Sequence, residues 1–243
     1  FIKDWHISAP AVELNNFASD LHLPLKYTSD PYAAETPLTD ITSVAGVPVV
    51  EIKKTRLDGW GRIYKRLFDG VFSLFFLILF SPLLLIIALF VKLTSRGPAI
   101  FLNERIGEGG KVFHLFKFRT MYAEYSIGRQ FPGSAEALEF EQKLIRERGI
   151  KAGPVYKIKN DPRATAVGKF LRKTSLDELP QLFNVLFGSM SLVGPRPHQP
   201  REVEKYERHH LKVLNIKPGI TGMAQVSGRS DLEFEDEVWL DTY

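Results

Sequence analysis

The sequence predicts an α+β fold. We expect a compact, mostly helical domain with a short β-hairpin, attached to a re-entrant membrane helix that is broken at Ser81-Pro82. Three observations predict this. A stretch of 22 residues, Gly70–Val91, has no charged side chain; two short apolar runs flank a glycine-rich turn; and several later segments have helical patterns.

Composition narrows the classes of function. The chain has 243 residues, of which 44% are hydrophobic and 25% charged, and this balance excludes wholesale disorder. It has no Cys, which excludes disulfide scaffolds, Cys-ligated metal sites and thiol catalysis. Aromatic and basic residues are not interleaved as in single-strand-binding modules, so we expect no nucleic-acid partner. The basic excess of residues 60–130 is better explained by a membrane surface.

The first 59 residues are acidic and precede this basic block. They show no signal-peptide pattern, and we expect them to be the tail of an upstream domain followed by a linker. The apolar run at 47–52 predicts one strand, whose partner strands we expect to lie outside this chain.

The uncharged run is a membrane candidate because roughly 20 helical residues cross the hydrocarbon of a bilayer. A buried core helix is the alternative. Pro82 lies near the middle of this run and cannot donate a backbone hydrogen bond to Ile78, so we expect a kink in the helix. The Ser81 hydroxyl can replace part of the missing hydrogen bonding. Basic residues flank both ends, which by the positive-inside tendency places both on the cytoplasmic side. A re-entrant helix fits these facts, and a kinked spanning helix remains open.

The remaining elements follow in order. Strands are expected at 98–103 and 112–119, joined by a hairpin turn at 107–111 whose glycines lack the spacing of a phosphate-binding loop. Helices are expected at 135–148, 166–173, 177–187, 200–214 and 231–243.

Two adjacent carboxylates, Asp177 and Glu178, follow two cations and precede an apolar helix. The alternative to catalysis is a capping box, because Ser175 and Glu178 have its spacing. Helical neighbours point about 100° apart, so we expect the two acids to have different tasks. One can attack an electrophile while the other holds a metal.

Three other segments carry candidate ligands of an anion. Prolines on both sides hold Arg196 in a stiff loop suited to bidentate phosphate binding, or to a structural ion pair. The segment 217–229 has three glycines that permit close approach to a ligand, with Gln225 and Arg229 as donors, or it is simply a tight loop. Lys117 and Arg119 alternate on a strand and would face one side, with a solvated face as the alternative. The six His show no metal-ligand spacing.

Together these segments resemble the bacterial sugar transferase family, whose members are monotopic polyprenyl-phosphate phosphoglycosyl transferases. The resemblance covers Tyr64 to Tyr243, about three quarters of the chain. It rests on six ordered motifs: 65–69, Ser81-Pro82, 116–121, 175–181, 192–197 and 217–229.

The resemblance implies an activity and residue roles. A sugar 1-phosphate would pass from a UDP-sugar to undecaprenyl phosphate with release of UMP, as the first membrane step of exopolysaccharide, capsule or O-antigen assembly. Asp177 would be the nucleophile of a ping-pong sequence and Glu178 the Mg²⁺ ligand. Arg172 and Arg196 would clamp phosphates, with Lys117 as a weaker candidate.

The resemblance also implies location and partners. We expect the bacterial inner membrane, with contact to membrane lipids and the catalytic domain on the cytoplasmic face. The expected division is a linker region at 1–59, the membrane helix at 60–96 and the catalytic domain at 97–243, truncated at its C-terminus. Larger relatives make a homodimer one option. A membrane glycosyltransferase that releases UDP and a non-enzymatic membrane scaffold remain alternatives.

Overall fold

A computed structural model describes the chain over ten ranges, and its contacts divide the chain into two units, Phe1–Lys65 and Arg66–Tyr243. The described ranges are 26–27, 39–44, 47–52, 59–128, 130–131, 134–148, 158, 161–207, 209–228 and 232–242.

The first unit contains an antiparallel sheet in the order β1–β3–β2, formed by β1 (Lys26–Tyr27), β2 (Thr39–Val44) and β3 (Val47–Ile52). The strand expected at 47–52 is confirmed. The expectation that its partners lie outside the chain was wrong, because β2 pairs with β3 from Thr39↔Ile52 to Val44↔Val47. The β-branched residues of β2 favour this extended conformation.

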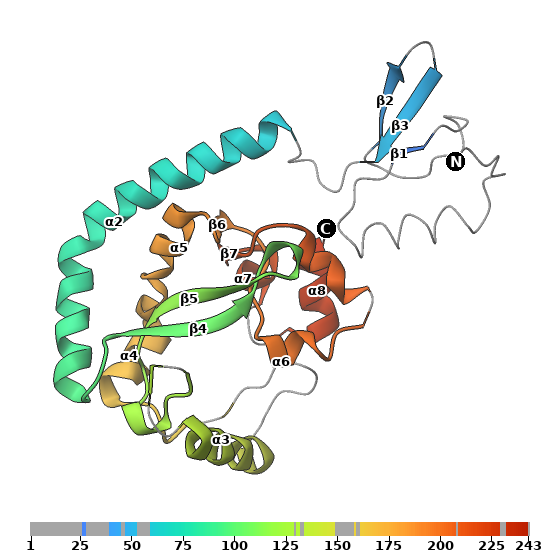
Figure 1. Cartoon of the computed structure of the whole chain (residues 1–243). Helices are drawn as coiled ribbons and strands as arrows, with labels where there is room; N and C mark the ends of the chain where they lie inside the picture. The colour runs from blue at the N-terminus through green and yellow to red at the C-terminus, as the bar shows by residue number, and fades with distance from the viewer. Residues whose placement is uncertain are drawn as a thin grey trace. The chain divides into compact units, whose positions relative to one another are not determined.

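The uncharged run lies inside α2 (Trp60–Thr94), a helix of 35 residues. We predicted that the helix breaks at Ser81-Pro82. Instead it continues through Pro82, and Figure 1 shows that it curves along its length. The predicted role of Ser81 is confirmed: its hydroxyl donates to the Ile78 carbonyl at 2.8 Å, the acceptor that Pro82 cannot serve. This local bond keeps the turn helical where a backbone donor is missing.

The surface of α2 is largely uncovered by protein. In its most apolar window only 17% of the residues are buried, and by length and composition the helix is able to cross a membrane. Large side chains such as Ile78 and Leu85 are 67% and 73% exposed. This exposure does not fit a buried core helix, whose apolar surface would be covered on all sides.

The predicted hairpin is confirmed. Strands β4 (Ile100–Ile106) and β5 (Val112–Phe118) pair antiparallel from Ile100↔Phe118 to Ile106↔Val112. The turn between them contains the short 3₁₀ segment η2 (Glu108–Gly110), in which Gly109 and Gly110 have φ of 68° and 73°. Glycine is suited to these left-handed positions.

Most predicted helices are confirmed to within a few residues. These are α3 (Ser134–Arg148), α4 (Ala166–Thr174), α5 (Gln181–Phe187) and α8 (Phe234–Thr242). The helix expected at 200–214 is instead two pieces, α6 (Pro200–Val203) and the 3₁₀ helix η5 (His210–Asn215). Four further short elements were not predicted from the sequence: η3 (Ala123–Tyr125), β6 (Ser191–Val193), β7 (Gly219–Thr221) and α7 (Met223–Ser227).

The hairpin forms the centre of the second unit (Figure 1). Phe118 of β5 packs with the end of α2 and with α4, through Ile87, Val91 and Leu171. Leu115 of β5 forms a second apolar cluster with Val185 and Met190. Ile106, at the end of β4, belongs to a third cluster with η5 and α8. The hairpin therefore joins the apolar helix to the C-terminal elements.

Segment 217–229 forms β7 and α7 instead of the tight loop weighed as the alternative, and two of its three glycines lie where backbone segments approach closely. Strands β6 and β7 pair in parallel, and a Cβ on Gly219 would lie 2.1 Å from the Gly194 nitrogen. A Cβ on Gly222 would lie 2.3 Å from the Gly194 oxygen. The two glycines allow this close approach to the loop that carries Arg196.

Candidate active site

The two adjacent carboxylates lie in a tight turn between two helices. Ser175 ends α4 with φ of 57°, and Asp177 and Glu178 follow in the 3₁₀ turn η4 (Leu176–Glu178). The capping-box alternative was wrong, because the Ser175 side chain makes no cap hydrogen bond and α5 begins only at Gln181. The turn brings both carboxylates to one pocket, which ideal helical spacing does not predict.

The environments of the two acids push their pKa values in opposite directions. Asp177 is 9% exposed, and burial raises its pKa despite the opposing charges of Lys117 and Arg172. Burial also acts to raise the pKa of Glu178, but the nearby cations, Lys117 first among them and then Arg196 and Arg105, together outweigh burial and the pKa is lowered. The Lys117 ammonium lies 2.7 Å from Glu178 Oε1. Neighbouring groups with separated pKa values are characteristic of sites that divide chemical tasks.

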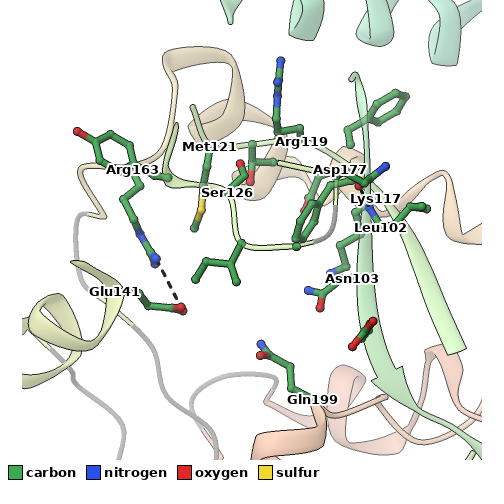
Figure 2. Close-up of a pocket in the computed structure, with 18 of the residues that line it drawn as sticks. Leu102, Asn103, Lys117, Arg119, Met121, Ser126, Glu141, Arg163, Asp177 and Gln199 are labelled. Atoms are coloured by element: carbon green, nitrogen blue, oxygen red, sulfur yellow. Dashed lines mark hydrogen bonds and ion pairs between the residues drawn. The ribbon is translucent and has the colours of Figure 1, made fainter. Parts of the chain in front are cut away.

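These residues line an open pocket of about 890 Å³. Figure 2 shows Asp177 and Lys117 at one end and the pair of Arg163 and Glu141 at another. Of the other predicted residues, Arg172 also lines the pocket, with its side chain 38% exposed. The volume is in the range of sites for ligands of nucleotide size.

Arg172 reaches the pocket from α4. Its Nε donates to Thr120 Oγ1 at 2.8 Å, and its Nη1 lies 3.8 Å from Asp161 Oδ2. The negative charge of Asp177 acts on the guanidinium, which shows that the two groups are neighbours. The structure therefore brings together Asp177, Glu178, Lys117 and Arg172 from the predicted set.

Arg196 lies beside this group but does not line the pocket. Its backbone N–H donates to Asp241 Oδ2 at 3.2 Å, while its guanidinium makes no hydrogen bond or ion pair with other described residues. The positive charge of Arg196 contributes to the low pKa of Glu178, so the guanidinium is near that carboxylate. An Arg in this setting is available for an anionic ligand.

Of the other two predicted donors, only Gln225 belongs to the described residues, and it does not line the pocket. Gln225 lies on α7, and its amide oxygen is packed against Gly222 without a hydrogen-bond partner among the described residues. Arg229 lies outside the described residues.

Two basic residues have structural roles that the sequence did not suggest. Arg119 is buried and donates to the carbonyls of Ser95 and Arg96 at the end of α2, at 2.5 and 2.7 Å. Arg66 donates to the carbonyls of Val185 and Leu186 at 2.6 and 2.7 Å, at the end of α5. Cations at these positions satisfy free carbonyls and complement the helix dipole. The solvated-face alternative for Arg119 was wrong.

Several charged residues of the site were missed. Asp161 and Arg163 form a bidentate pair at 2.9 and 2.8 Å, and Glu141 of α3 lies 3.7 Å from Arg163. Asp241 accepts from the backbone of both Arg196 and Ala224 at 3.2 Å, joining the two loops that β6 and β7 introduce. An acid–proline–arginine triplet just before a helix was the one available signal for the first pair.

Two of the histidines gather with an acid away from the pocket. His209 and His210 lie within reach of both oxygens of Glu235, close enough for a metal ion. However, His210 Nδ1 accepts from the Glu207 backbone N–H, so Nε2 carries the proton that it shares with Glu235 at 2.7 Å. In this tautomer, inferred from the bonding pattern, Nε2 has no lone pair for a metal.

Comparison with known proteins agrees with this geometry. The sequence model of a family described as "Bacterial sugar transferase" matches residues 60–243, which include the apolar helix and every element of the pocket. The chain belongs to the bacterial sugar transferase family.

Related members of the family have informative names. UDP-glucose:undecaprenyl-phosphate glucose-1-phosphate transferase of Klebsiella pneumoniae is 45% identical over 76% of this chain and 35% of its own length. Undecaprenyl-phosphate galactose phosphotransferase of Salmonella typhimurium is 46% identical over 75% of this chain and 36% of its own length. Exopolysaccharide production protein ExoY of Rhizobium meliloti is 40% identical, over 75% of this chain and 76% of its length. The chain thus spans about a third of the first two relatives.

Proposed function

We propose that this protein transfers a sugar 1-phosphate from a UDP-sugar to undecaprenyl phosphate, releasing UMP, in the assembly of a cell-surface polysaccharide. The observation that carries the proposal is the Asp177–Glu178 turn, which places a buried carboxylate beside an ion-paired one in a pocket lined by cations. The family and the names of its members supply the donor and acceptor classes.

Asp177 suits the role of nucleophile. Its carboxylate oxygen attacks the phosphorus that carries the sugar, the bond from that phosphorus to the bridging oxygen breaks, and UMP leaves with the electron pair. An oxygen of the lipid phosphate then attacks the same phosphorus and releases the Asp177 carboxylate. The raised pKa of Asp177 marks a poorly hydrated and more basic oxygen.

The cations in and beside the pocket suit a diphosphate. Arg172 in the pocket and Arg196 beside it offer planar guanidinium groups for bidentate contacts with phosphate oxygens, and Lys117 offers a point charge next to Glu178. Charge builds up on the leaving UMP during transfer, and fixed cations stabilise it without reorganisation.

Glu178 fits a magnesium ion by its chemistry. Its Oε1 is bound to Lys117, and its Oε2 has no hydrogen bond or ion pair with the described residues. Magnesium prefers such carboxylate oxygens, and when bound it would neutralise diphosphate charge. The proposal predicts that excess EDTA abolishes UMP release and that Mg²⁺ restores it; equal activity in EDTA would exclude the metal role.

The re-entrant topology gains support from the contacts at both ends of α2. Near its start, Arg66 binds the end of α5 and Asp69 accepts from the Leu192 N–H. At its end, Arg119 binds the last carbonyls. All of these partners belong to the second unit. A helix whose two ends contact one folded unit returns to the side from which it entered, here proposed as the cytoplasmic face of the inner membrane.

Topology can be tested directly because the chain has no Cys. Single cysteines placed next to Arg62 and next to Arg96 should both be labelled from the cytoplasmic side by a reagent that cannot cross the membrane. Labelling from opposite sides would establish a spanning helix, and the Cys-free parent is the control.

The reaction type is tested by its product. The full-length protein, given UDP-glucose or UDP-galactose and undecaprenyl phosphate, should release UMP. Release of UDP would identify a glycosyltransferase that leaves the phosphate behind, and no nucleotide release with a panel of UDP-sugars would favour a scaffold.

A further inference from the structure

The position of Arg172 depends on a close approach between two backbone segments. Gly168 of α4 lies so near the end of β5 that a Cβ on it would be 1.9 Å from the Thr120 oxygen. The Thr165 backbone N–H donates to that same oxygen at 3.0 Å, and Thr165 Oγ1 caps α4 by accepting from the Gly168 N–H at 2.9 Å. Arg172 follows one turn after Gly168 and meets the Thr120 side chain.

A second contact restrains the same guanidinium. Asp161 Oδ2 lies 3.8 Å from Arg172 Nη1, and the Asp161 carboxylate accepts hydrogen bonds from Nε and Nη2 of Arg163. Arg163 is itself 3% exposed and pairs with Glu141 of α3, so the Asp161 carboxylate has little freedom to turn. Burial acts to raise the pKa of Asp161, but Arg163 and Arg172 outweigh it, so the carboxylate stays ionised at neutral pH.

We propose that Thr120 and Asp161 are positioning residues that orient Arg172 toward the phosphorus bonded to Asp177. The two contacts occupy Nε and one side of Nη1, which leaves the other N–H groups of the planar fork for the substrate. Two fixed partners reduce the rotamer freedom that a long side chain otherwise loses on binding. The inference rests on the proposed function, because it requires Arg172 to bind a phosphate.

A double-mutant cycle tests this dependence. In the full-length protein, Arg172→Ala should lower kcat/KM for the UDP-sugar by roughly a hundredfold, the range expected for a charge-assisted contact. Asp161→Asn should lower it by about tenfold in the parent and by less than twofold when Arg172 is already Ala, because a positioning residue has nothing left to orient. Asp236→Asn, an exposed acid on α8, is the matched control and should change nothing.

Variants of Thr120 supply a second test, which does not depend on whether Asp161→Asn folds. Thr120→Val keeps the shape but removes the acceptor for Arg172 Nε, and should cost about as much as Asp161→Asn. Thr120→Ser keeps the hydroxyl and should restore most of the activity. The Val variant should lose its effect in the Arg172→Ala background.

The outcomes separate the inference from the function. If Asp161→Asn and Thr120→Val cost the same with Ala at position 172 as in the parent, their effects do not pass through Arg172 and the inference is wrong, while UMP release still stands. If Arg172→Ala has no effect, the inference and the clamp role both fail. If the parent releases no UMP, the proposed function itself fails.

Discussion

Gly168→Ala is the sharpest perturbation of the site that leaves every charged group in place. The added Cβ would meet three backbone atoms of Thr120, at 1.9, 2.6 and 2.7 Å, and backbone atoms cannot rotate away as a side chain can. Ordinary contact begins at 3.4 Å, so α4 and the end of β5 must separate by about 1.5 Å. That shift carries Arg172 away from Thr120 and from the pocket.

The magnitude follows from these distances. Overpacking of this kind costs about 1–3 kcal/mol or more. At roughly 2–4 °C per kcal/mol for a chain of this size, the midpoint of thermal unfolding should fall by about 2–12 °C. A catalytic group misplaced by about 1 Å typically costs on the order of a hundredfold in rate, so UMP release should fall by that amount.

Gly70→Ala is the matched control, because a Cβ there has nothing within 4 Å and the residue lies in a helix. It should leave UMP release unchanged and should not lower the unfolding midpoint. If Gly168→Ala had the same unfolding midpoint and the same rate of UMP release as the parent, α4 would not approach Thr120 as closely as described.

Three further predictions concern the carboxylates and the helix bend. Lys117→Met should lower kcat/KM by roughly 10–100-fold. Because Lys117 is the main group that lowers the pKa of Glu178 against the effect of burial, the variant should also show the acid limb of its pH–rate profile at higher pH; an unmoved limb would contradict this. Asp177→Asn should abolish transfer yet raise the unfolding midpoint at neutral pH. Burial raises the pKa of Asp177, so the folded state binds its proton more tightly than the unfolded chain, and the parent loses stability as pH rises. The gain should therefore shrink toward low pH, and an equal gain at all pH values would show that ionisation of Asp177 does not cost the folded state stability. Ser81→Ala should destabilise the protein by about 0.5–1.5 kcal/mol, measured as unfolding in detergent, with no change if the carbonyl finds another donor.

Local patterns in the sequence were sufficient for the longer helices, for the hairpin and for several of the residues that line the pocket. The hairpin followed from two apolar runs and a glycine turn, and Asp177, Glu178, Lys117 and Arg172 do meet in one pocket. Such features depend on neighbours in the chain, so short-range reasoning reaches them.

Other features depend on contacts between distant segments, which a single sequence does not display. Ser175 has the spacing of a cap, but α4 runs up to it and the residue adopts a left-handed conformation that ends that helix. Asp161 and Asp241 act on residues 11 and 45 positions away, Arg172 and Arg196. The basic flanks of α2 were interpreted as membrane signals, and residues 65–69 also as a family motif, but neither interpretation predicts that Arg66 binds the end of α5.

In the proposed mechanism Asp177 takes up the sugar phosphate before the lipid arrives. This order of steps can be measured as UMP release from a UDP-sugar by the full-length protein without undecaprenyl phosphate. We expect a burst of about one UMP per active site, with the sugar phosphate left on the protein at Asp177, and no burst from Asp177→Asn. UMP that appears only after the lipid phosphate is added, or a burst of equal size from the Asn variant, would contradict it.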